Sequence, residues 1–64
     1  MNAQFSDHML TVLEASRYLR LSRSQVYLMI QKKRIPHIRL SQRRIVIRQS
    51  DLTAWLEHRK VAVN

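Results

Sequence analysis

The chain has 64 residues, 45% of them hydrophobic, with no cysteine, no glycine and a formal net charge of +8. A chain of this length forms one domain at most, and without cysteine it can have neither disulfides nor thiolate metal sites. Its hydrophobic content is typical of a globular fold rather than of disorder, and no apolar run approaches the roughly 18 residues that span a membrane.

The N-terminal residues 1–9 show no hydrophobic periodicity and lack the basic and then apolar regions of a signal peptide. We therefore expect a flexible arm over residues 1–9 and a soluble, cytoplasmic protein. One folded domain is expected over residues 10–60, followed by a frayed tail over residues 61–64.

Two start signals for helices follow the arm at short range. Thr11 precedes Glu14 by three residues, and Ser22 precedes Gln25 by the same interval. Both pairs have the spacing of a capping box, in which each side chain bonds the backbone N–H of the other residue. The spacing predicts a first helix over residues 12–19 and a second over residues 23–32.

The tight connection between these helices indicates a helix-turn-helix. Such a turn needs one residue with positive φ, and because the chain has no glycine the candidate is Arg20, at a cost of roughly 1 kcal/mol. Helical spacing predicts these inward-facing residues: Val12, Ala15, Tyr18 and Leu19 in the first helix, and Val26, Met29 and Ile30 in the second. Ser16 is expected to point outward. Ser24, Tyr27, Leu28 and Gln31 lie on the opposite side of the second helix.

A proline and two β-branched runs follow the second helix. Pro36 prevents the helix from continuing. Ile38 and Leu40, and then Ile45 and Ile47, alternate with other residues about a turn at residues 41–43, which predicts a hairpin.

A third helix is predicted to begin at Ser50 as its N-cap. It would bury a face that contains Leu52, Trp55 and Leu56. The order helix, helix, hairpin, helix predicts an α+β fold, a small winged helix-turn-helix with a two-stranded wing.

Charge is concentrated in the wing region. Seven basic residues and no acid occur between Lys32 and Arg48. A solvated surface would account for such a run, but the excess of charge favours a polyanionic partner. A membrane-surface role would require the charge on one amphipathic helix, whereas this run crosses Pro36.

Three segments of the sequence together carry a family resemblance. LTVLEASRYLRLSRSQVYLMI, IPHIRL and RRIVIRQSDLTAWL resemble the excisionase-type branch of the MerR-like winged-helix domains. The resemblance covers Leu10 to about Glu57. Members of this branch usually hold glycine after the first helix, before the wing and in the wing turn, where this chain has Arg20, Lys33 and Ser41-Gln42.

The resemblance implies a function as well as a fold. A stand-alone chain of this length is similar to a recombination directionality factor, which binds adjacent sites head to tail, bends attachment-site DNA and directs a tyrosine integrase towards excision. The expected partners are therefore double-stranded DNA, a tyrosine integrase and further copies of the chain. A small AlpA-like or MerR-like transcriptional regulator, and an interaction module that docks a protein without binding DNA, remain alternatives.

The residues themselves suggest how DNA would be bound. The second helix would enter the major groove, with the fork of Arg23 suited to the two acceptors of guanine. The predicted contacts of this helix are Arg23, Ser24, Gln25, Tyr27, Gln31 and Lys32. Those of the wing and its flank are Lys33, Arg34, Arg39, Arg43 and Arg44. Arg43 and Arg44 would reach the adjacent minor groove, while Lys32, Lys33 and Arg39 suit phosphates.

Catalysis is not expected from this sequence. The three histidines, His8, His37 and His58, lie in separate segments, and no nucleophile with a neighbouring base and no Gly-rich phosphate loop occurs. Three scattered histidines do not form a zinc site. We expect no enzyme activity, cofactor, metal ion, small-molecule ligand or membrane partner.

Overall fold

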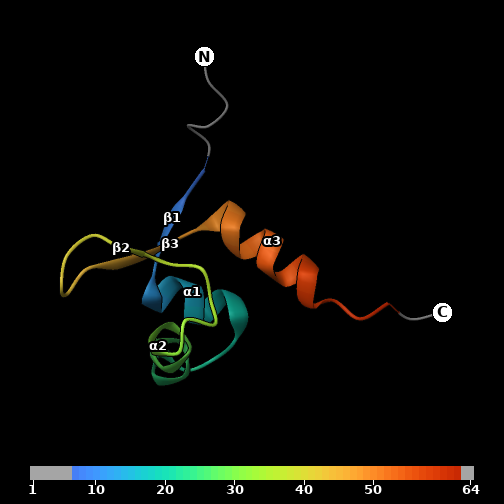
Figure 1. Ribbon diagram of the computed structural model, residues 1–64, viewed down its shortest axis with the longest axis horizontal. Coiled ribbons are helices and arrows are strands. Elements are labelled where there is room, and N and C mark those ends of the chain that lie inside the picture. Colours follow the sequence, from blue (N-terminus) through green and yellow to red (C-terminus); the bar gives the residue numbers. More distant parts are fainter. Residues whose placement is uncertain (1–6, 63–64) are drawn as a thin grey trace, which may run out of the picture.

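The computed structural model describes residues 7–62 and contains three helices and three strands within that range. The elements in chain order are β1 (Met9–Thr11), α1 (Val12–Leu19), α2 (Arg23–Gln31), β2 (Ile38–Arg39), β3 (Ile45–Arg48) and α3 (Gln49–Arg59). Figure 1 shows the loop between β2 and β3 on one side of the crossing strands and α3 on the other. The predicted α+β winged helix-turn-helix is confirmed.

The two predicted capping boxes are both formed. Thr11 accepts a hydrogen bond from the Glu14 backbone N–H at 3.0 Å, and the Glu14 carboxylate accepts from the Thr11 N–H at 2.8 Å. Ser22 and Gln25 make the same reciprocal pair at 3.1 and 3.2 Å. Each box satisfies backbone donors that the first helical turn leaves without a partner, so both helices start where the sequence predicts.

Both helices of the pair end at a left-handed residue that is not glycine. Arg20 has φ 61°, as predicted, and Lys33 after α2 has φ 56°. At each end the next residue bonds back across a full turn, from the Leu21 N–H to the Ser16 carbonyl at 2.8 Å and from the Arg34 N–H to the Met29 carbonyl at 2.9 Å. These are Schellman motifs, and their hydrogen bonds offset the steric cost of a side chain at positive φ.

The sheet has a third strand that we did not predict. Its order is β1-β3-β2 with antiparallel pairs, and Leu10 of β1 lies opposite Ile47 of β3. The predicted hairpin is formed by β2 and β3, with Ile38 opposite Val46. Three residues of alternating burial give too weak a local signal to identify β1, whose place depends on pairing with a strand more than thirty residues away.

The predicted N-terminal arm, residues 1–9, falls largely outside the described residues. Its last three residues are described: Met9 is the first residue of β1, and the two residues before it contact α3. The His8 carbonyl accepts from the Gln49 N–H at 2.9 Å. The Asp7 carboxylate accepts from the Ser50 N–H at 3.2 Å and from the Ser50 hydroxyl at 2.9 Å. Its distance to Arg48 Nε is 3.9 Å.

These contacts correct the predicted start of the third helix. Ser50 is not its N-cap, because α3 begins at Gln49, and the capping residue Arg48 makes no side-chain cap hydrogen bond. The acceptors for the first N–H groups of α3 come instead from residues 7 and 8, so the segment that precedes β1 stabilises the helix that follows β3.

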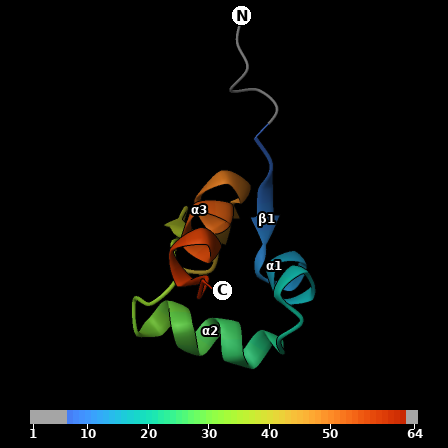
Figure 2. The ribbon, with the colours of Figure 1, turned by 90° about the vertical axis from the view of Figure 1, so that its right-hand side faces the viewer.

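The hydrophobic core lies between α1, α2, the sheet and α3. Figure 2 shows α2 running across the base of the molecule with α1 and α3 above it. The fully or nearly buried apolar residues are Val12, Ala15, Val26, Ile30, Ile35, Ile47 and Leu52. Trp55, predicted to be core, is half-buried, and its indole N–H donates to the Arg34 carbonyl at 2.9 Å. Trp55 therefore joins α3 to the segment between α2 and the wing.

For two residues of α1, the predicted burial or exposure of the side chain was wrong. Tyr18 is 51% exposed, and Ser16 is buried at 3%. The buried stripe of α1 follows the spacing Val12, Ala15, Ser16, Leu19, so position on the helix outweighs residue type. Burial of Ser16 is tolerated because its hydroxyl donates to the Leu13 carbonyl at 2.7 Å.

The wing turn forms without a left-handed residue. The Leu40 N–H donates to the Arg44 carbonyl at 2.8 Å, and the Arg44 N–H donates to the Ser41 carbonyl at 3.3 Å. The Arg39 guanidinium donates to the Gln42 carbonyl at 3.2 Å across the loop. Leu40, which we expected to alternate with the core residues, is 61% exposed because β2 ends at Arg39.

We predict that Asp7→Ala lowers the free energy of unfolding by about 1 kcal/mol, since it removes the acceptor for two groups of Ser50. Thermal denaturation measures this change. His8→Ala is the matched control and should be nearly neutral, because His8 contacts α3 through its backbone carbonyl. Equal stability of the Asp7 variant and the wild type would show that the contact does not hold α3.

Candidate nucleic-acid interface

Helix α2 has one buried and one exposed face. Val26 and Ile30 are buried at 0% and 3%, and Met29 packs partly against the core. Three of the predicted DNA-contact residues, Ser24, Tyr27 and Gln31, are exposed on the other side. This division leaves hydrogen-bonding side chains free for a ligand while the apolar stripe anchors the helix.

Two predicted contact residues have structural hydrogen bonds of their own. The Gln25 side-chain oxygen accepts from the Ser22 N–H at 3.2 Å, which leaves its amide NH₂ for other partners. Arg39 uses one guanidinium nitrogen for the Gln42 carbonyl, so it supports the shape of the wing turn. Both residues are exposed, and contact with a ligand would be in addition to these roles.

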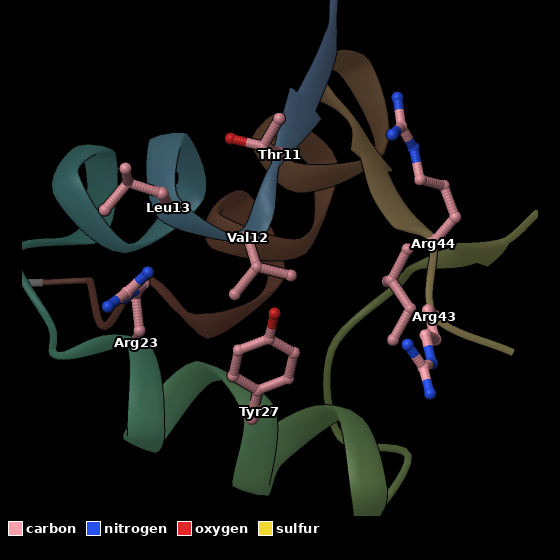
Figure 3. Close-up of a pocket in the computed structure, with 8 residues that line it drawn as sticks. Thr11, Val12, Leu13, Arg23, Tyr27, Arg43 and Arg44 are labelled. Atoms are coloured by element: carbon pink, nitrogen blue, oxygen red, sulfur yellow. The ribbon is translucent and has the colours of Figure 1, made fainter.

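A cleft of about 270 Å³ lies between α2 and the wing. Four predicted site residues line it: Arg23 and Tyr27 from α2, and Arg43 and Arg44 from the wing. Figure 3 shows Tyr27 rising from α2 with its hydroxyl directed into the cleft, with Arg23 on one side and the wing arginines on the other.

The other predicted site residues do not line this cleft. They are exposed on α2, on the segment that follows it and on β2: Ser24, Gln25, Gln31, Lys32, Lys33, Arg34 and Arg39. Within α2 the cleft therefore includes only Arg23 and Tyr27. The other polar residues of the helix, and the basic residues 32–34 that follow it, lie outside the cleft.

Sequence reasoning missed four residues that line the cleft: Thr11, Val12, Leu13 and Ile45. Each had a structural interpretation as a cap, a helix residue or a strand residue. Their proximity to the wing depends on β1 pairing with β3, and that pairing left no local signal in the sequence.

The arginines of the cleft are not neutralised by acids within the described part of the chain. The ion pairs there are Arg48 with Asp7 and Lys60 with Glu57. Glu14, near the cleft in sequence, directs its carboxylate to the Thr11 N–H. The cleft therefore has a positive potential that favours an anion.

Residues 7–62 include no helix with the length and apolar character that a membrane crossing requires. The same residues contain no group of three or more histidine or acidic side chains placed to hold a metal ion.

Comparison with protein families matches residues 9–60 of the chain to the helix-turn-helix domain. This range includes every described strand and helix. No significant match to the chain was found among curated proteins or among solved structures.

The association constant for duplex DNA should fall as the salt concentration rises. We predict that Arg43→Ala makes the slope of the logarithm of this constant against the logarithm of the salt concentration shallower by about one unit, because one fewer phosphate would be neutralised. Titrations by fluorescence anisotropy at several salt concentrations measure this slope. Arg43→Lys keeps the charge and should keep the slope. An unchanged slope in the alanine variant would show that the tip of the wing does not contact the DNA backbone.

Proposed function

The chain belongs to the helix-turn-helix domain family and is a DNA-binding protein, and we propose that it recognises specific duplex sites to control site-specific recombination. The observation that carries the proposal is the exposed polar face of α2 beside a basic wing, with a cleft between them. This arrangement suits a helix in the major groove and a β-loop over the neighbouring backbone.

Arg23 is the proposed base reader. It is the first residue of α2, it is exposed, and it takes part in neither of the ion pairs found among residues 7–62. The N-terminal residues of a recognition helix contact base edges, and an arginine fork bonds guanine O6 and N7 together. Ser24 and Gln31 extend the same exposed side along the helix axis.

The exposed basic residues outside the cleft are proposed to bind phosphates. Lys32, Lys33 and Arg34 follow the C-terminal end of α2, and Arg39 lies on β2. Contacts of this kind fix the position of a protein on the duplex without reading its sequence. They also make the affinity depend steeply on salt.

A role in excision rests on the resemblance of the sequence to excisionases. One module of this size buries a small interface, so a single copy should discriminate poorly between sites. Cooperative head-to-tail binding of several copies, with bending of the DNA, would supply the missing specificity. A contact with a tyrosine integrase would then favour excision over integration.

We predict that Arg23→Ala weakens binding to a specific duplex by ~1–3 kcal/mol more than binding to a scrambled duplex. Affinities for both duplexes measure the difference. Arg59→Ala removes the same charge from α3 and should affect both duplexes alike. Equal losses in the Arg23 variant would assign Arg23 to the phosphate backbone.

An excision assay in vitro tests the biological role. A tyrosine integrase and the attachment-site DNA that it recombines are combined with and without the protein, and we expect the protein to raise the yield of excision and not of integration. Unchanged excision together with altered transcription from a bound promoter would instead identify a transcriptional regulator. Absence of any binding to duplex DNA in dilute buffer would leave only the interaction module.

A further inference from the structure

The cleft between α2 and the wing has contributions from several parts of the chain. Thr11 comes from β1, Leu13 from α1, Tyr27 from α2, and Arg43 from the loop before β3. This space of about 270 Å³ is brought together by the pairing of β1 with β3 and the packing of α1 on α2.

The chemistry of the cleft suits a singly charged, tetrahedral oxyanion with apolar substituents. Val12 and Ile45 form an apolar part of its lining, and three arginines contribute positive charge. No acidic residue lines it. A phosphodiester matches both features, since its oxygens carry the charge and its sugars present apolar edges.

Tyr27 is the polar group best placed to hold such an anion. Its side chain is 49% exposed, and Figure 3 shows the ring rising from α2 with its hydroxyl directed toward Val12, which also lines the cleft. None of the hydrogen bonds between described residues uses this hydroxyl. A phenol in this position is a free donor.

The two grooves of DNA are separated by one sugar–phosphate strand. If α2 lies in the major groove and the wing reaches the minor groove, that strand has to pass between them. The cleft is the space between these two parts of the protein.

On the basis of the proposed mode of DNA binding, we propose that the cleft holds one phosphodiester of this strand. Its ligands are the Tyr27 hydroxyl and the Arg43 guanidinium. Tyr27 is thereby a backbone ligand that sets the position of α2 in the groove, and base reading falls to residues such as Arg23.

The test combines variants with chemically altered DNA. A preferred duplex is first selected from a random library with the wild-type protein. Duplexes that carry a single neutral methylphosphonate at each successive position are then titrated with the wild type and with Tyr27→Phe. Tyr18→Phe is the matched control, because Tyr18 is similarly exposed but does not line the cleft.

We expect one phosphate position at which the methylphosphonate weakens wild-type binding roughly tenfold. Tyr27→Phe should bind the unmodified duplex about tenfold more weakly, with an unchanged preferred sequence. The methylphosphonate at that one position should weaken its binding less than it weakens wild-type binding, because only the contact with Arg43 is then left to lose. Tyr18→Phe should behave as the wild type does.

Two outcomes would overturn the phosphate site while leaving the proposed function intact. One is equal sensitivity of the wild type and Tyr27→Phe at every phosphate. The other is a changed base preference in Tyr27→Phe, which would make Tyr27 a base reader. Failure of the wild type to bind any duplex would overturn the proposed function itself, and the phosphate site with it.

Discussion

The orientation of α2 depends on three consecutive residues, Arg20, Leu21 and Ser22. Arg20 ends α1 in the left-handed conformation, and Ser22 caps α2 two residues later. Leu21, between them, packs against the core and bonds back to Ser16. Because each residue has its own constraint, the angle between the helices is set locally, and the same rotation of α2 that buries Val26 and Ile30 directs its polar side outward.

Strand β3 then determines where the wing lies relative to that surface. It is the central strand, paired with β1 on one side and β2 on the other. Through β1 it is connected directly to the start of α1, and Ile47 is fully buried in the core. The wing is therefore an extension of the core rather than a separate arm, and this is why Arg43 and Arg44 line the same cleft as Arg23 and Tyr27 of α2.

Features that depend on residues close together in the sequence could be predicted, and features that depend on residues far apart in the sequence could not. The capping boxes, the turn at Arg20 and the hairpin depend on residues a few positions apart, and all were predicted correctly. Strand β1 and the contact of Asp7 with Ser50 join residues about forty positions apart and left no local pattern. The cleft shows both cases: its arginines were predicted individually as contact residues, but their grouping with Thr11 and Tyr27 depends on that long-range pairing.

The positive surface results from how the four acidic residues are used. Glu14 completes the capping box of α1, and Asp7 holds the start of α3 together with Arg48. Asp51 lies in the first turn of α3, where the helix dipole favours an acid, and Glu57 pairs with Lys60 near its end. Each acid therefore supports the start or the end of a helix, and none lines the cleft. The same residues that stabilise the fold leave the wing and the exposed side of α2 without counter-charges, so the repulsion among their cations is relieved when a polyanion binds.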